Sequence, residues 1–335
     1  MIALAKKVPE LSLLIAIIIG AYIVMGVFSQ VAHTETLTPA MAWWIVFASF
    51  ILSTIIAVVA VLGGVGGGVI YTPIMLGFTS VDSLLIRSTG LVVAMFSGLV
   101  SSGPFMRRGL ADIKLVLYCA IPIVVGAMLG AKSAIYLADA LGEQGDGLVR
   151  LLLGGILVFI AFMFIAGGSK TEYPTPKRID RLSRRLNLKA AYWEETLGRP
   201  VHYQATHILL GWVLFLLVGF TGGFFGLGGG WAVVPVLNLI MTVPLKVAAA
   251  SSGVLLALGN AAAIWPYIVK GALIAVFAAP WMLGQVVGGI LGAHILAHIR
   301  AAFVRNLLIA LLFLTSIKLI ARGLETLFGF DIPLV

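Results

Sequence analysis

Two glycine clusters are the part of the sequence whose residue types and spacing could do chemistry. The first runs from Gly63 to Gly68 and the second from Gly226 to Gly230, and each precedes a short apolar run that contains a proline. Glycine destabilises a helix interior by about 1 kcal/mol relative to alanine, so these clusters either break a helix or let helices pack closely. A break at membrane depth frees backbone N–H groups, and a helix that begins there favours an anion at its N-terminus. The spacing predicts such an anion site, with close packing as the alternative.

Polar residues at matching places in the two halves could complete an anion site. The hydroxyls of Ser88-Thr89 and of Ser251-Ser252 could bind anion oxygens, or bond back to their own helices. Arg87 could attract the anion or extend its side chain toward the membrane surface, and Gln285 could line the pathway. The predicted substrate-binding residues are Gly66, Gly67, Gly68, Arg87, Ser88, Thr89, Gly228, Gly229, Gly230, Trp231, Ser251, Ser252 and Asn260.

Patterns typical of enzymes, metal sites and nucleotide sites do not occur in the sequence. Cys119 is the single cysteine, so no disulfide framework or cysteine metal site is expected. Neither glycine cluster has the G-x-G-x-x-G frame or the lysine of a phosphate-binding loop. No Ser-His-Asp set or cluster of metal ligands stands out. We therefore predict no catalytic residue, no metal and no cofactor, and a protein that is not an enzyme.

Composition places the chain in a membrane. Apolar residues make up 61% and charged residues 10%, and the mean hydropathy is +1.12. A soluble domain is about half apolar and a quarter charged. Apolar runs of about 20 residues recur, the length that a helix needs to cross a bilayer. We predict an all-α polytopic membrane protein surrounded by lipid, and expect no nucleic-acid partner despite a net charge of +9.

The chain repeats itself. Gly64 is matched by Gly226 and Pro73 by Pro235, an offset of 162 residues (226 minus 64). Each predicted repeat has a re-entrant or broken helix pair and three spanning helices, and the odd number of elements inverts the second repeat, as in secondary transporters. The predicted units are an N-terminal transmembrane helix with an outer loop (1–42), repeat 1 (43–167), a basic cytoplasmic linker (168–205) and repeat 2 (206–335).

Charged residues predict the orientation in the membrane. Lys6 and Lys7 favour a cytoplasmic N-terminus before an apolar run over 11–31, which we interpret as a retained helix. The acidic loop 138–148 is expected outside, and so is the C-terminus. The basic linker is expected inside, where apolar residues at helical spacing from Ile179 to Trp193 predict an amphipathic helix on the inner leaflet. The alternative is a plain connection whose charges enforce the topology.

With these two glycine motifs, the chain resembles the TauE/SafE sulfite exporter family. The resemblance covers about residues 43–321 and is carried by Gly64-Val65-Gly66-Gly67-Gly68 through Pro73 and by Gly226-Leu227-Gly228-Gly229-Gly230 through Pro235. It implies a multi-pass protein of the bacterial inner membrane that exports a sulfur-containing anion, such as sulfite, sulfoacetate or a related organosulfonate. The substrate site would lie between the inverted repeats.

The near absence of membrane-embedded carboxylates agrees with anion export, because an anion leaves a negative-inside cell without a coupling ion. The alternatives are an anion uptake carrier, a channel-like permease, and a membrane scaffold for sulfur-metabolising enzymes. The sequence leaves open which anion is carried, in which direction, with which coupling ion, and whether copies of the chain form a homo-oligomer.

Overall fold

The computed structural model describes residues 39–63, 66–107, 110–166, 174, 180–194, 198–295 and 301–329. The predicted N-terminal helix over 11–31 lies outside these residues. The chain is an all-α polytopic membrane protein: within the described part, six helices are long and apolar enough to cross a membrane.

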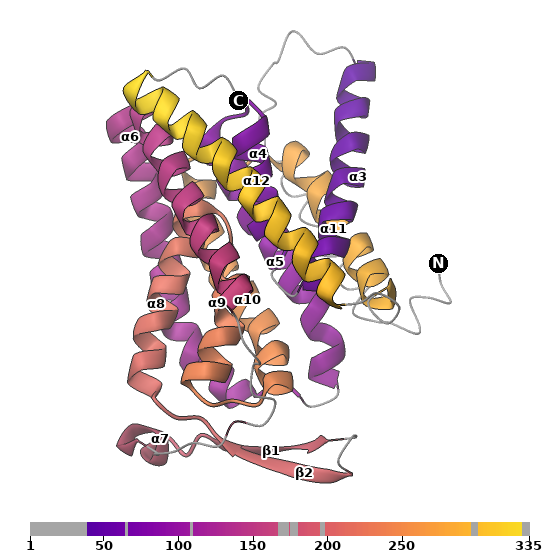
Figure 1. Cartoon of the computed structure of the whole chain (residues 1–335), viewed down its shortest axis with the longest axis vertical. Helices are drawn as coiled ribbons and strands as arrows, with labels where there is room; N and C mark the ends of the chain where they lie inside the picture. Colours follow the sequence, from indigo (N-terminus) through magenta and orange to yellow (C-terminus); the bar gives the residue numbers. More distant parts are fainter. Residues whose placement is uncertain are drawn as a thin grey trace.

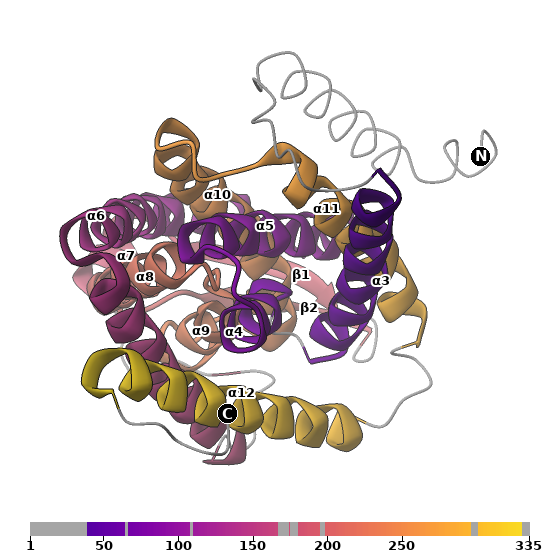
Figure 2. The same ribbon diagram turned by 90° about the horizontal axis from the view of Figure 1, so that it is seen from above.

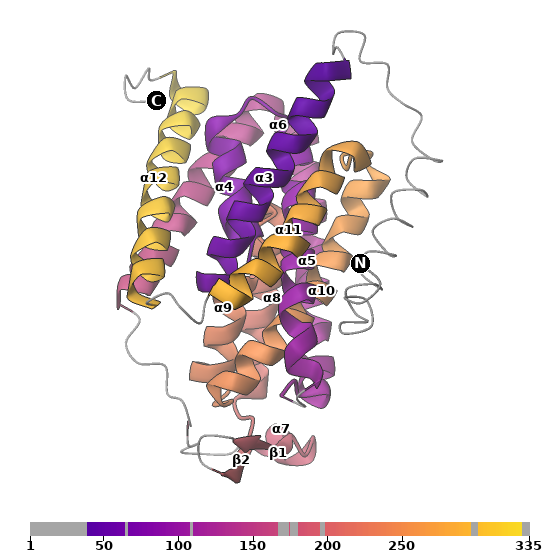
Figure 3. The ribbon, with the colours of Figure 1, turned by 90° about the vertical axis from the view of Figure 1, so that its right-hand side faces the viewer.

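The helices run lengthwise through the molecule, and a small hairpin lies at one end (Figures 1 and 3). The first half contains α3 (Pro39–Gly63), α4 (Gly68–Phe78), α5 (Ser83–Arg107) and α6 (Ile113–Ala166). The connecting segment contains α7 (Arg181–Arg185), β1 (Lys189–Glu194) and β2 (Arg199–Gln204). The second half contains α8 (Ile208–Phe225), α9 (Gly230–Pro235), the π-helix η1 (Val236–Ile240), α10 (Leu245–Val269), α11 (Ala275–Ile295) and α12 (Ala301–Phe328).

Helix α6 is two helices joined at one glycine. Gly142 has φ 52° and ψ −126°, which reverses the chain between two helical stretches. The sequence predicts a loop over 138–148, but Asp139 and Asp146 both lie within helix on either side of Gly142. The left-handed φ suits glycine, so one residue makes the turn that was expected to need a loop.

Two broken helix pairs enter the molecule from opposite ends. Figure 1 shows α3 and α4 toward the top, and α8 and α9 toward the bottom, near the hairpin. Seen along the helices, α4 and α5 lie in the interior, α3 and α6 lie on opposite sides, and α12 runs along one edge (Figure 2). Helix α5 packs against α10, α3 against α11, and α8 against α6. The glycine clusters therefore lie at the inner ends of the two pairs.

Glycines let α6 approach α8 and let α11 approach α3 closely, as small residues do between helices in membranes. Gly126 of α6 faces the carbonyl of Leu216 of α8, and Gly288 of α11 faces the carbonyl of Thr54 of α3. These two contacts are related by the same offset of 162 residues, because 126 becomes 288 and 54 becomes 216. The equivalence supports the predicted duplication, whose full extent stays a prediction.

The linker does not form the predicted amphipathic helix. Helix α7 has only five residues, and Asn187, with φ 48°, follows its end. Residues from Lys189 onward form an antiparallel hairpin with Gly198 at its turn, so Trp193 lies on a strand. The prediction is wrong because Tyr192 and Tyr203 bury their rings on the paired strands, where aromatic side chains are favoured.

The hairpin is anchored to the ends of two membrane helices. The Tyr203 hydroxyl donates a hydrogen bond to Oδ2 of Asp112 (2.8 Å), which lies just before α6. At the end of β1, the buried carboxylate of Glu194 lies 2.5 Å from Nζ of Lys246, in the first turn of α10. Burial and then the nearby Asp112 carboxylate raise the pKa of Tyr203, so its hydroxyl keeps its proton and remains a donor. The linker thus joins the first half to the second at one end of the bundle.

Candidate functional site

The chain breaks at both glycine clusters, as the sequence predicts. Helix α3 ends at Gly63 and α4 begins at Gly68, whereas α8 ends at Phe225 and α9 begins at Gly230. Left-handed φ values occur at Gly66 (82°), Gly226 (71°) and Gly228 (66°). Side chains disfavour that region, so glycine allows the sharp reversals between each pair of helices.

The two clusters meet inside the molecule. A methyl group on Gly66 would lie 4.0 Å from the Cα atom of Gly230. One on Gly68 would lie 2.5 Å from the carbonyl oxygen of Leu227, and one on Gly228 would lie 2.6 Å from the Cβ atom of Ala94. The clusters therefore both break helices and pack closely, and we call their meeting line the glycine seam (66–68 and 226–230).

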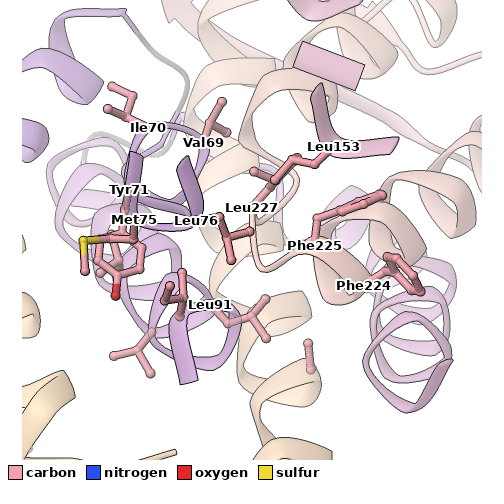
Figure 4. Packing of buried hydrophobic residues seen from close by; sticks show 14 of the residues in the cluster. Val69, Ile70, Tyr71, Met75, Leu76, Leu91, Leu153, Phe224, Phe225 and Leu227 are labelled. Atoms are coloured by element: carbon pink, nitrogen blue, oxygen red, sulfur yellow. The ribbon is translucent and has the colours of Figure 1, made fainter. Parts of the chain in front are cut away.

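A continuous apolar core packs against one side of the glycine seam. Figure 4 shows the labelled members of this core, which come from α4, α5, α6, the end of α8 and the second glycine cluster: Val69, Ile70, Tyr71, Met75, Leu76, Leu91, Leu153, Phe224, Phe225 and Leu227. Leu227, between the glycines of the second cluster, is 1% exposed. This apolar packing excludes water from that side, which strengthens any electrostatic interaction at the seam.

Side chains satisfy the carbonyl groups at the end of α8. Three of them donate hydrogen bonds there: Tyr267 to Gly223 (3.0 Å), Arg87 Nη1 to Phe224 (3.3 Å) and Thr72 to Gly226 (2.7 Å). One of these donors is a cation. The partial negative charge that a helix C-terminus carries is therefore offset at the seam.

The helices that begin at the seam lack side-chain caps. Neither Gly67 before α4 nor Gly229 before α9 provides one. The Gly67 N–H donates to Ser97 Oγ (3.2 Å). First-turn amides have no partner within their own helix, so these two starts carry partial positive charge. With the α8 carbonyls already bonded, the partial charge that the helix ends leave at the seam is positive.

Buried polar atoms without a partner lie beside the seam. The side-chain amide of Asn260 packs against Gly228, that of Gln285 against Gly67, and Trp231 follows Gly230 directly. Asn260 Nδ2, Trp231 Nε1 and Gln285 Oε1 have no hydrogen-bond partner. Gln285 is held in place because its Nε2 donates to Ser53. Buried polar atoms normally find a partner, so two free donors here mark a place for a ligand or water.

Arg87 lies behind the seam rather than in it. Its side chain is fully buried, and Nη2 lies 3.9 Å from Asp146 Oδ1 without a hydrogen bond. Its backbone packs against Gly226, while its guanidinium extends to the end of α8. The prediction that Arg87 attracts an anion is untested, and the arrangement gives this residue a clear structural task as well.

The predicted hydroxyls are not gathered at one place. Ser88 donates to the carbonyl of Ala272 (3.0 Å), which follows α10. Ser251 accepts from the N–H of Asp112 (3.2 Å), which precedes α6, and Ser252 donates back to the carbonyl of Ala249 (2.8 Å). These three serines serve helix contacts, so their role in binding an anion stays a prediction.

Thr89 differs from the serines. Its hydroxyl is buried and interacts with the hydroxyl of Tyr71, whose ring packs edge-on against Trp281 with ring centroids 4.5 Å apart. Nε1 of Trp281 has no hydrogen-bond partner. A second buried polar group, separate from the glycine seam, therefore lies between α4, α5 and α11.

Several residues that contact the seam could not be identified from the sequence. Thr72, Ser97 and Tyr267 are isolated polar groups in apolar helices, and nothing in their spacing shows which backbone group each bonds. Gln285 was expected along the pathway but not among the binding residues. Within the described ranges no three histidine, cysteine or acidic side chains gather as a metal site would require.

Comparison with known proteins shows what the chain is similar to. Residues 48–319 match the protein family described as "Sulfite exporter TauE/SafE". A curated protein of Bacillus subtilis (strain 168), named "Probable membrane transporter protein YunE", is 26% identical over 283 residues, which are 82% of this chain and 97% of that protein. No solved structure matches the chain.

Proposed function

Because the chain belongs to the sulfite exporter TauE/SafE family, we propose that this membrane transporter exports a sulfur-containing anion through the glycine seam. The proposed substrates are sulfite, sulfoacetate or a related organosulfonate. One observation carries the proposal: three side chains satisfy the carbonyls at the end of α8, whereas donors of Asn260 and Trp231 beside the uncapped helix starts have no partner.

The charge of the helices around the seam supports an anion. The sequences of α4, α5, α9 and α10 contain no aspartate or glutamate. A cation at the seam would meet two helix N-termini without a compensating carboxylate on these helices. An anion would accept hydrogen bonds from the free donors there.

The membrane potential favours the export of an anion. A monovalent anion that leaves a negative-inside cell gains about 2.3 kcal/mol per 100 mV, so no coupling ion is required. We place the protein in the bacterial inner membrane with its N-terminus and hairpin in the cytoplasm and its C-terminus outside, because the linker is rich in Lys and Arg.

The test is flux from proteoliposomes that contain the purified chain. Sulfite, sulfoacetate, taurine and sulfate are loaded separately, and efflux is followed with and without an imposed inside-negative potential. We expect saturable efflux of sulfite or an organosulfonate that the potential accelerates. A current that rises without saturation would favour a channel, and no efflux of any sulfur anion would refute the proposal.

Asn260→Asp tests whether the seam is the pathway. The substitution keeps the shape of the side chain but replaces a donor with a carboxylate, which repels an anion, so sulfite efflux should fall by about tenfold or more. Asn306→Asp on an exposed part of α12 is the matched control and should retain wild-type efflux. Equal efflux in both variants would place the pathway elsewhere.

Alanine substitutions test the predicted serine contacts separately. Ser88→Ala and Ser251→Ala each remove a hydroxyl that contacts a neighbouring segment. If the hydroxyls also bind the anion during transport, the sulfite concentration for half-maximal efflux rises in both variants. An unchanged value in both would remove these serines from the site and leave the seam proposal standing.

A further inference from the structure

A hollow of about 550 Å³ opens at the end of the molecule opposite the hairpin, between the end of α4, the second half of α6 and the end of α12. Its walls consist of charged and hydroxyl side chains: Thr79, Ser80, Glu143, Arg150, Arg322, Glu325 and Thr326. The volume lies within the range of small-molecule sites. We call it the outer hollow.

Charges in the outer hollow are sorted by depth. Arg150 and Arg322 are half-buried, whereas Glu143 and Glu325 are exposed. Water screens the exposed carboxylates, but the half-buried guanidinium groups have lost part of their hydration. The deeper part of the outer hollow is therefore positive even though its formal charges cancel.

The two arginines are differently engaged. Arg322 Nη1 donates to the carbonyl of Thr79 (3.1 Å), which fixes its guanidinium at the wall beside the end of α4. Arg150 Nε is buried and has no hydrogen-bond partner. Guanidinium groups bind oxyanions through paired N–H donors, and Nε–H of Arg150 is one donor that the protein leaves without a partner beside the outer hollow.

The outer hollow is connected to the glycine seam through a third arginine. Arg150 lies near enough to interact electrostatically with the carboxylates of Asp146 and Glu325 and with the guanidinium groups of Arg322 and Arg87. Arg87 in turn bonds Phe224 beside the second glycine cluster. Three guanidinium groups thus lead from the open hollow to the seam, with Asp146 between the inner two. An anion between Arg150 and Arg322 would reduce the repulsion between them.

We propose that the outer hollow is a second anion site, where Arg150 and Arg322 bind a small sulfur oxyanion between the glycine seam and the surface. This inference rests on the proposed function, because it makes the outer hollow the next binding position along the same pathway. Arg87 is the positioning residue between the two sites, and the exposed carboxylates favour release by repelling an anion that moves outward.

The experiment is equilibrium binding of radiolabelled sulfite to the full chain in detergent. Arg150→Gln and Arg322→Gln each remove one cation from the outer hollow, and Lys318→Gln is the matched control. Lys318 lies one turn before Arg322 on α12, but its Nζ lies over the Phe78 ring, 4.3 Å from the centroid, and does not line the hollow. The wild type should show two classes of site, one of which weakens by about tenfold or more in the two arginine variants.

Asn260→Asp separates this inference from the proposed function. That variant should lose the class of site at the seam and keep the class in the outer hollow. If it binds like the wild type while the arginine variants lose a class, the seam proposal fails and the outer hollow stands. The outer-site proposal would be overturned if both arginine variants bound sulfite like the wild type. It would also be overturned if the wild type showed one class of site and Asn260→Asp removed that class.

Folding is checked by the thermal unfolding midpoint of each variant. If Arg150→Gln or Arg322→Gln does not fold, Arg150→Lys and Arg322→Lys retain the charge but lose the paired donors. These variants should weaken the same class of site by a smaller factor, and wild-type affinity in both would contradict the proposed role of the two guanidinium groups.

Discussion

A single methyl group at Gly68 tests how tightly the glycine seam is built. In Gly68→Ala the new Cβ atom would lie 2.5 Å from the Leu227 carbonyl oxygen and 2.9 Å from both the Ala94 Cβ atom and the Gly90 carbonyl oxygen. Ordinary contact begins at 3.4 Å, so the Leu227 carbonyl must move by about 0.9 Å (3.4 minus 2.5). Backbone and Cβ atoms cannot rotate away, and such overpacking typically costs about 1–3 kcal/mol.

The movement would displace the second glycine cluster relative to the first. Because Leu227 lies between Gly226 and Gly228, a shift there moves the start of α9 away from the start of α4. We expect Gly68→Ala to lower the thermal midpoint by several degrees and sulfite efflux by roughly tenfold, since misplacement of about 1 Å has effects of that order or larger.

The assay compares Gly68→Ala with Gly155→Ala. Gly155 lies within α6, and a methyl group there would meet nothing within 4 Å. Alanine favours a helix over glycine, so this control should keep wild-type efflux and stability. Wild-type efflux and midpoint in Gly68→Ala would show that the seam tolerates the displacement and would refute this account of its packing.

Three further predictions concern residues around the seam and the hairpin. Arg87→Gln removes the charged donor at the end of α8 and should lower the unfolding free energy by about 1.5–3 kcal/mol, measured by denaturant unfolding; a variant as stable as the wild type would show that the bond to Phe224 contributes nothing. Tyr203→Phe removes the hydrogen bond to Asp112, which should speed amide hydrogen exchange in the hairpin and leave exchange in α5 unchanged; equal exchange rates would contradict anchoring through this bond. At Asp180, burial acts to raise the pKa, but hydrogen bonds from Ser183 and from the backbone of His207 outweigh it and hold the pKa below its usual value. The stabilisation is therefore present above the unfolded-state pKa and is lost as the pH falls through the folded-state pKa. Proteolysis of the linker should become faster over that acidic range in the wild type but not in Asp180→Asn. The same dependence of proteolysis rate on pH in both proteins would refute this role of Asp180.

The broken helices were predictable because their signal is local. Clusters of glycine at Gly63–Gly68 and Gly226–Gly230 cannot continue a helix cheaply, and the short runs after them are too short to span a membrane alone. The structure breaks α3 from α4 and α8 from α9 at these places. Local backbone preference and length were sufficient, since nothing distant competes with them.

The linker was harder to predict because two periodicities overlap there. Leu182 and Leu186 follow a helical spacing, but Tyr192 and Tyr203 bury their rings on facing strands of a hairpin. Docking against α6 and α10 decides between the two, and this tertiary contact leaves no periodic signal. The reason differs at Gly142, where a single glycine with a left-handed φ of 52° makes the turn in place of the expected loop.

The composition of the candidate site could be predicted only in part. Residue type singled out Asn260 as a polar group in an apolar helix and the glycines as clusters, and their role in binding stays a prediction. The partners of Ser88 and Ser251 are backbone groups of segments that are distant in the sequence, Ala272 and Asp112. Which hydroxyl bonds a helix and which remains free depends on helix rotation, and one sequence does not specify it.

The most direct test of the central claim is the position of bound sulfite in an experimental structure. The chain is imaged in lipid nanodiscs at a sulfite concentration that saturates efflux. We predict density between the starts of α4 and α9, within hydrogen-bond distance of the Asn260 side chain. Saturated transport with no density at the glycine seam, or with sulfite bound only elsewhere in the molecule, would contradict it.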